Sequence, residues 1–408
     1  MASAAETEVP ERNTAFDPFL KAKPKPTLAA PMAEPRRLRG HKATATCCIA
    51  SVDRPGLVAT SGEDGCVCWF DMRCKDVLFV MKVGDDPITS LCYKQGNEDI
   101  IYVSSGNEVK VFDVHLATSW KPLESYNYNK EEINQIVCNS KSAFVAAADD
   151  GGDVKIIDIR QKCLYKTLRA GHKMYSFFLG DNGKSSQVVL IQDLLCGTSP
   201  RDAHIRFWTL SSMSYDVGIP GAETRDNAGR CFNPAFIHAI AVPEVDMWEK
   251  LGRICVVARG DGGVDVIDIE SELASTGSKS SLKTRRGSQS RSKGSVPSPD
   301  TEAQEENLRK KLHLDYSFGG HTTAVSCVAF SKFGEKGKYI ISGGNDKAVK
   351  AWDWSRYFDD GQSSSKSDLL HLNINLSKKV NWLCTTPTDS ENLVVCDTSK
   401  VVKAYTVV

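Results

Sequence analysis

Residues 319–354 decide the fold of this chain. The segment 319–331, GGHTTAVSCVAFS, is typical of a turn followed by a strand. The segment 338–354, KYIISGGNDKAVKAWDW, is typical of two strands around a tight Gly-Asn-Asp turn. Valine, isoleucine and small residues alternate in both segments, as half-buried strands require. We therefore expect three consecutive antiparallel strands here.

This pattern recurs along the chain. Three Gly-His pairs occur, at Gly40-His41, Gly171-His172 and Gly320-His321. Roughly 30–36 residues after each pair comes an aromatic residue at a strand end, and the three sites are Phe70-Asp71, Trp208-Thr209 and Trp352-Asp353. A Gly-His start and a Trp-Asp finish in a unit of about 40–45 residues are the signature of WD40 repeats. The chain therefore resembles WD-repeat proteins over most of its length.

The resemblance and the degenerate copies between the clear repeats predict an all-β fold, a single seven-bladed WD40 β-propeller over residues 34–408. The expected blades span about 37–78, 79–119, 122–165, 166–214, 229–271, 313–355 and 371–408. The last repeat ends on a third strand. We expect residues 34–39 to supply its missing outer strand, which would fasten the two ends of the ring and remove an open sheet edge.

Composition separates two segments from the ring and limits the function. Residues 1–33 hold five prolines and predict a flexible tail, whereas 272–312 is rich in serine, first basic and then acidic, and predicts a disordered loop. The 51 basic and 51 acidic residues cancel, which gives no bulk attraction to nucleic acid or membrane. No transmembrane run or secretory signal is recognisable. The 14 cysteines form no CxxC pair, so we expect buried thiols, no metal site and an intracellular location, in the nucleus or the cytoplasm.

A hydrogen-bond chain inside each blade follows from the resemblance to WD repeats. In this pattern a Trp bonds a hydroxyl, the hydroxyl bonds the His of Gly-His, and the His bonds an Asp in the tight turn. The sixth blade would use Trp352, Ser342, His321 and Asp346, and the fourth would use Trp208, Thr198, His172 and Asp202. The first blade keeps His41 and Asp64 but has Phe70 at the Trp position. We interpret these His–Asp pairs as structural and not catalytic, because they repeat at blade spacing.

Four shorter segments narrow the resemblance to the WD repeat-containing protein 53 family, and a plant-type member would fit it. They are Glu131-Glu132-Ile133-Asn134, Asn233-Pro234-Ala235 with His238, Gly343-Gly344-Asn345-Asp346, and Lys379-Val380-Asn381-Trp382-Leu383. The chain departs from this family in the first half of the fourth blade and in the position of its long loop. No catalytic motif is recognisable, since the Gly183-Lys184-Ser185 run lacks the first glycine of a phosphate loop. We therefore expect a non-enzymatic scaffold without cofactors or a small-molecule substrate.

Two strand ends resemble a sequence box found in WD proteins that act as substrate receptors of cullin-4 RING ubiquitin ligases. In that box an Arg follows the terminal Trp-Asp by two residues. The first blade offers Phe70, Asp71 and Arg73, and the third offers Ile157, Asp158 and Arg160, where isoleucine replaces the aromatic residue. Asp71 and Arg73 are two residues apart in one strand, so the carboxylate can hold the guanidinium for a partner. The resemblance implies docking on the ligase adaptor.

The alternative is a general interaction scaffold or peptide-reading propeller, in which these arginines cap solvated strand ends. The partners are proteins on either interpretation: the ligase adaptor and an unknown substrate, or other proteins. Two boxes and the family resemblance keep both interpretations open. Ser298, followed by Pro299, is a candidate phosphorylation site for a proline-directed kinase.

Overall fold

The computed structural model describes residues 34–116, 121–139, 143–169, 177–181, 186–193, 203–209, 214–218, 237–243, 254–268, 311–354 and 369–407. The predicted tail and residues 272–310 of the predicted loop lie outside the described residues. Residues Glu34–Val408 form one compact unit, and all the described strands belong to it.

The described strands pair into seven four-stranded antiparallel sheets. Three of them come from the first half of the chain, and each uses four strands that are consecutive in sequence. They are β2 (Ala45–Ala50), β3 (Leu57–Gly62), β4 (Cys66–Asp71) and β5 (Val77–Lys82); β6 (Leu91–Tyr93), β7 (Ile100–Ser105), β8 (Glu108–Asp113) and β9 (Glu124–Tyr126); and β10 (Ile133–Cys138), β11 (Phe144–Asp149), β12 (Asp153–Asp158) and β13 (Cys163–Arg169).

The remaining sheets continue this order, and the last one also takes in a strand from the start of the unit. They are β14 (Phe177–Asp181), β15 (Ser186–Asp193), β16 (Ala203–Thr209) and β17 (Ser214–Gly218); β18 (Ile237–Ala241), β19 (Ile254–Arg259), β20 (Val264–Asp268) and β21 (Lys311–Leu314); β22 (Val325–Phe330), β23 (Tyr339–Gly344), β24 (Ala348–Asp353) and β25 (Leu370–Asn375); and β26 (Val380–Thr385), β27 (Leu393–Asp397) and β28 (Val401–Tyr405) with β1 (Arg36–Arg39). Six sheets are described with their side chains, and β14–β17 by strand pairing alone.

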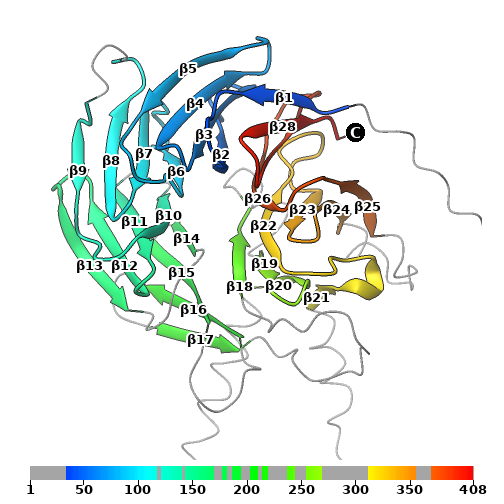
Figure 1. Ribbon diagram of the computed structural model, residues 1–408. Helices are drawn as coiled ribbons and strands as arrows, with labels where there is room; N and C mark the ends of the chain where they lie inside the picture. Colours follow the sequence, from blue (N-terminus) through cyan, green and yellow to red (C-terminus); the bar gives the residue numbers. More distant parts are fainter. Residues whose placement is uncertain are drawn as a thin grey trace, which may run out of the picture. The chain divides into compact units, whose positions relative to one another are not determined.

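The sheets follow one another around a closed ring (Figure 1). The first strand of each sheet contacts the first strand of the next, and the last of these, β26, contacts β2. The only helix in the described part of the chain is the short 3-10 turn η2 (Tyr316–Phe318). The predicted all-β propeller is therefore confirmed.

A shared irregularity joins neighbouring sheets near the ring axis. Five first strands carry a register shift at their second residue, and these residues are Thr46, Asn134, His238, Ser326 and Asn381. A bulge turns its side chain out of the sheet's own ladder. The Ser326 hydroxyl donates to the carbonyl of Val380 (2.6 Å) in the next sheet, and the Asn381 amide donates to the carbonyl of Ala45 (3.0 Å). The bulges thus connect one blade to the next.

The ring is closed by the N-terminal strand. Strand β1 pairs antiparallel with β28, with Arg36 opposite Ala404 and Arg39 opposite Val401. The prediction that residues 34–39 complete the last sheet is confirmed. Leu38 is the buried residue of β1, and it packs with Val402 and Phe70.

The repeat units expected from sequence are offset from the sheets by one strand. The repeat signature ends near the third strand of each sheet, whereas each sheet includes a fourth strand beyond it. Thus β9 falls in the unit expected at 122–165 and β25 in the unit expected at 371–408, although they belong to the preceding sheets. The two insertions shift accordingly: residues 269–310 join β20 to β21, and 354–369 join β24 to β25, each within one sheet. Residues 311 and 312, expected in the disordered loop, belong to β21.

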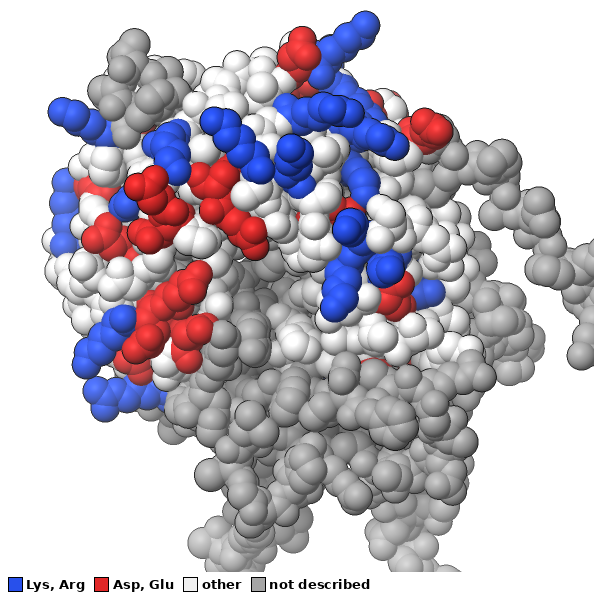
Figure 2. Space-filling model, in the orientation of Figure 1, with Lys and Arg blue, Asp and Glu red and all other residues white. Residues whose placement is uncertain are grey.

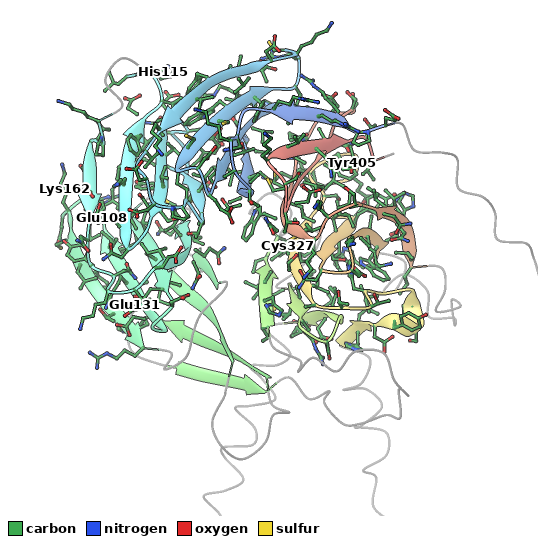
Figure 3. All side chains as sticks on the ribbon, viewed as in Figure 1. Glu108, His115, Glu131, Lys162, Cys327 and Tyr405 are labelled. Carbon is green, nitrogen blue, oxygen red and sulfur yellow. The ribbon has the colours of Figure 1, made fainter. Side chains whose placement is uncertain are left out.

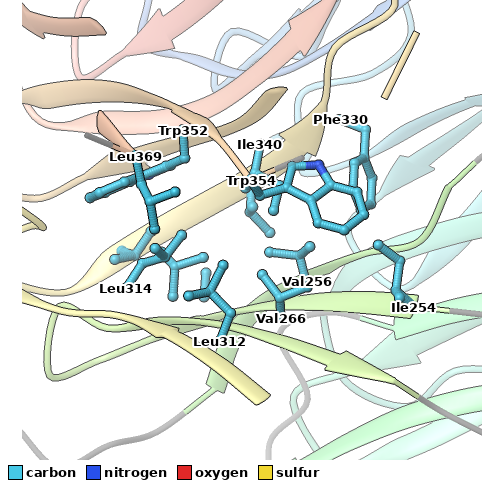
Figure 4. Close-up of a cluster of buried hydrophobic side chains, with 14 of the residues drawn as sticks. Ile254, Val256, Val266, Leu312, Leu314, Phe330, Ile340, Trp352, Trp354 and Leu369 are labelled. Carbon is cyan, nitrogen blue, oxygen red and sulfur yellow. The ribbon is translucent and has the colours of Figure 1, made fainter. Parts of the chain in front are cut away.

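The core consists of apolar layers between successive sheets. Between β18–β21 and β22–β25, Val256, Val266 and Leu312 pack against Ile340 and Trp352 (Figure 4). All five are at most 3% exposed. At about 25 cal/mol per Å² of apolar surface, such layers supply most of the free energy that holds the blades together. The ring therefore presents its turns and strand ends on two rigid faces.

Candidate functional site

The two faces of the ring carry different features. In the six blades where the link between the second and third strands is described, these strands meet in a tight turn on one face, called here the turn face; examples are Gly62–Cys66 and Gly344–Ala348. The third strands end on the opposite face, called here the box face, which includes the turn Asp71–Cys74. The candidate docking arginines therefore lie on the box face, because they follow third strands.

Arg73 is held on the box face by Asp71. The Arg73 guanidinium donates to both carboxylate oxygens, from Nε to Oδ1 (2.9 Å) and from Nη2 to Oδ2 (2.7 Å). The Arg73 backbone N–H also donates to Asp71 Oδ1 (2.8 Å). The hydrogen bonds from the Arg73 side chain lower the pKa of Asp71, so the pair stays ionised. The Arg73 side chain is nevertheless 80% exposed, which leaves it available to a partner.

A second arginine fixes the turn that carries Arg73. Arg36 comes from the closing strand β1, and its guanidinium donates to the carbonyls of Met72 (2.5 Å) and Cys74 and to Glu391 Oε2 (2.7 Å). Beneath the turn, Phe70 is 1% exposed, so its ring belongs to the core. The first box is therefore anchored at the seam where the two ends of the ring meet.

The box of the third blade has the same backbone but a different side-chain arrangement. Asp158 Oδ1 accepts from the backbone N–H groups of Arg160 (2.8 Å) and Gln161 (2.9 Å). Within the described residues, the guanidinium of Arg160 makes no ion pair with Asp158 or with another carboxylate. Ile157 is fully buried at the aromatic position. The two boxes are thus alike in sequence, and only Arg73 is preorganised.

The predicted hydrogen-bond chain of the sixth blade is assembled in the structure. Trp352 Nε1 donates to Ser342 Oγ (3.1 Å), and Ser342 Oγ lies 2.8 Å from His321 Nε2. His321 Nδ1 lies 2.9 Å from Asp346 Oδ1, and Asp346 also accepts from backbone N–H groups of its turn. Burial raises the pKa of Asp346, but the hydrogen bond and charge of His321 outweigh it and leave the pKa lowered.

The first blade replaces one member of the chain. His41 Nδ1 lies 3.1 Å from Asp64 Oδ1, and His41 Nε2 lies 2.8 Å from Thr60 Oγ1. Phe70 has no N–H, and the Thr60 hydroxyl reaches the carbonyl of Cys68 (3.4 Å). Thr60 was not among the predicted residues, although it holds the position of Ser342 two residues before the end of its strand. The fourth-blade residues His172, Thr198 and Asp202, the side chain of Trp208 and the candidate phosphosite Ser298 lie outside the described residues.

The fifth blade holds a buried ionic cluster that sequence reasoning missed. Arg259 Nη1 donates to Asp265 Oδ2 (3.0 Å), and Arg259 Nε donates to the turn residue Asp261 (3.1 Å). His313 on the outer strand β21 lies directly opposite Asp265 and bonds its other oxygen. Arg259 and Asp265 are 3% and 7% exposed. No Gly-His pair precedes this blade, so the repeat pattern did not predict a hydrogen-bonded cluster here. The only indication in the sequence was an Arg and an Asp on either side of an Asp-Gly-Gly turn.

The described residues also contain no cluster suited to binding a metal ion. No group of three His, Cys, Asp or Glu side chains among them is arranged to hold a metal ion. The described cysteines are free thiols, most of them buried or half-buried, and burial raises the pKa of Cys327 to about 12. None of the described helical segments has the length and apolar character that a membrane crossing requires.

The repeats and the ring define the fold class of this chain, a β-propeller with WD40 repeats. The family described as WD domain, G-beta repeat matches residues 33–71 and 313–353. The WD40 β-propeller domain of Doa1 has a similar fold, with a TM-score of 0.60 and 13% identity over 91% of this chain and 96% of that one. Among curated proteins, the chain is similar to the WD repeat-containing protein 53 homolog of Dictyostelium discoideum, with 23% identity over 401 residues, 91% of this chain and 94% of the relative. The resemblance to WD repeat-containing protein 53 is therefore confirmed.

Proposed function

We propose that this chain is a substrate receptor of a cullin-4 RING ubiquitin ligase and that Arg73 docks on the ligase adaptor. The observation that carries the proposal is the pairing of an exposed Arg73 with Asp71 on an anchored turn. Arginine is a favoured interface anchor, and a guanidinium that is already oriented loses less conformational entropy when a partner binds. The role of Asp71 is to position Arg73, not to contact the partner.

The third-blade box has a minor part in this proposal. Arg160 is not held in place by Asp158, so docking would have to order it first. Its blade is also two steps away around the ring from the blade of Arg73. We therefore assign the docking contact to Arg73.

The test is the affinity of the full chain for the purified adaptor, measured by biolayer interferometry. We expect Arg73→Ala to weaken binding at least about tenfold and Asp71→Asn to weaken it less, because the guanidinium remains but is no longer held. Arg160→Ala and Lys75→Ala should have little effect; Lys75 is an exposed cation two residues beyond Arg73 and serves as the matched control.

Two outcomes would contradict the proposal. No binding of the adaptor by the wild-type chain would favour the alternative, a scaffold without a ligase role. Unchanged binding by the Arg73→Ala, Arg160→Ala double variant would remove the docking role from both boxes.

A further inference from the structure

Equivalent positions on the turn face carry opposite charges in two sheets. Glu131 and Glu132 directly precede β10, and Lys378 and Lys379 directly precede β26. A repeated backbone bond shows that the positions correspond: the N–H of Asp150 donates to the carbonyl of Glu132 (2.9 Å), as the N–H of Thr398 does to that of Lys379 (2.9 Å). All four side chains are exposed. The zero net charge of the chain therefore conceals a separation of charge across one face.

The basic side of this face is a group of six exposed residues, called here the basic arc. Its members are Arg39, Lys42, Lys347, Lys378, Lys379 and Lys400. Backbone contacts bring them together across three sheets. Leu376 N–H donates to the carbonyl of Lys347 (2.7 Å), Ala45 N–H donates to that of Ser399 (3.0 Å), and Arg39 pairs with Val401. Lysine and arginine side chains gather over β1 and beside β26 in Figure 2.

The charges of the basic arc are uncompensated. None of its six side chains forms an ion pair within the described part of the chain. Other lysines of the same face do pair, as Lys155 does with Asp153 (2.8 Å) and Lys403 with Asp397. Like charges on a rigid surface repel one another, and an anionic partner relieves that cost. The arc therefore has the electrostatic character of a binding surface for anions.

The acidic side of the same face limits the kind of anion. Asp85, Asp86, Glu131 and Glu132 are exposed there, and acidic side chains gather over β6 to β12 (Figure 2). Figure 3 shows Glu108 and Glu131 on this part of the ring, across from Tyr405 of β28. A long polyanion or an anionic membrane would span both sides and meet these carboxylates. A short acidic segment of a protein can contact the basic arc alone.

We propose that the basic arc binds a short acidic segment of a partner protein. The identity of that partner as the protein recruited for ubiquitination rests on the proposed function above. The third strands run from the turn face to the box face, so the segment and the adaptor would bind opposite faces and both could be bound at once.

The test is fluorescence anisotropy with a fluorescein-labelled peptide rich in Asp and Glu, its Asn/Gln counterpart, and a single-stranded oligonucleotide of equal charge. We expect the acidic peptide to bind, with an affinity that falls as salt rises, and the neutral peptide not to bind. The variant Lys379→Gln, Lys400→Gln should weaken binding roughly fivefold. The matched control Lys75→Gln, Lys121→Gln removes the same charge from exposed sites outside the basic arc and should bind like the wild type.

Absence of acidic-peptide binding, an equal loss in both variants, or tighter binding of the oligonucleotide would overturn the proposal. None of these outcomes involves the adaptor. Failure here is therefore distinguishable from failure of the docking role of Arg73.

Discussion

The fifth and sixth blades fasten the same tight turn with different chemistry. In the sixth, His321 bonds the turn residue Asp346, and the chain continues through Ser342 to Trp352. In the fifth, Arg259 bonds the turn residue Asp261 and the buried Asp265, which His313 also bonds. One blade thus uses a neutral hydroxyl and an indole, and the other a cluster of charges.

The residue before the turn explains this difference. Gly344 lies opposite Val325, and a Cβ there would come within 2.6 Å of His321 Nδ1 and 2.7 Å of Asp346 Oδ1. The equivalent position opposite Ile237 is Arg259, whose side chain can fill the space because no Gly-His histidine occupies it. The same position is Gly62 in the first blade, which has His41, and Asp149 and Asp397 in the third and seventh, which lack a Gly-His pair. Histidine and glycine therefore go together.

The largest effect is expected from breaking the cluster of the fifth blade. Arg259→Ala should lower the free energy of unfolding by about 3 kcal/mol, because it leaves the carboxylate of Asp265 buried with only His313 as its charged partner. Chemical denaturation measures the change. The double variant Arg259→Leu, Asp265→Leu should recover most of the loss, since apolar residues of similar size replace both charges; a loss under about 1 kcal/mol in the single variant would contradict the ionic interpretation.

A smaller effect tests the pairing of glycine with histidine in the sixth blade. Gly344→Ala should cost about 2 kcal/mol, because its Cβ would contact His321 and Asp346 too closely. In a His321→Ala background the same substitution should cost much less, since the space is then open. A double-mutant cycle by thermal or chemical denaturation measures the coupling, and additive costs would show that the histidine does not impose the glycine.

The smallest expected effect is the pH dependence of the stability that the ionic cluster of the fifth blade provides. Burial lowers the pKa of His313, but the hydrogen bond and charge of Asp265 outweigh it and raise the pKa above the ordinary value. Burial raises the pKa of Asp265, but His313 and Arg259 outweigh it and lower the pKa. The stabilisation from His313 is therefore complete below about pH 6.5 and declines as the pH rises through its raised pKa, while that from Asp265 declines as the pH falls through its lowered one.

The measurement is the difference in unfolding free energy between the wild type and His313→Gln across this range. We expect the largest difference between about pH 4 and pH 6.5. Asp315, 3.8 Å from His313, adds a weaker attraction of the same sign. A difference independent of pH would rule out the charged pair, and His313→Gln in an Asp265→Asn background is the control that should retain only the weaker dependence due to Asp315.

Repetition made most of the fold predictable from sequence. The Gly-His pairs, the alternating strands and the Trp-Asp ends predicted an all-β ring, and the unpaired third strand at the C-terminal end predicted closure by β1. The sheet boundaries were wrong by one strand, because β9, β21 and β25 are short or follow insertions and carry no repeat signature. Outer strands are half exposed, so composition constrains them least.

Some residues of the candidate sites were likewise predictable from sequence, and others were not. The resemblance to WD repeats predicted the partners His321, Ser342, Asp346 and Trp352, and the structure joins them by hydrogen bonds. The contact of Arg36 with the turn of Arg73 joins residues far apart in sequence, and no local pattern indicates it. The same holds for His313 and Asp265, which lie on either side of a long insertion. Contacts between residues far apart in sequence depend on how the strands pair, and only the structure provides that pairing.

Closure by β1 has a consequence for synthesis of the chain. Arg36 binds Glu391, 355 residues later, so β1 is made long before any strand that can pair with it. Until then it is a β-prone segment without a neighbour, the kind that invites association between nascent chains. Three of its four residues are arginines, and their mutual repulsion keeps such segments apart. The charges of β1 thus disfavour association between nascent chains until β28 is available to pair with it.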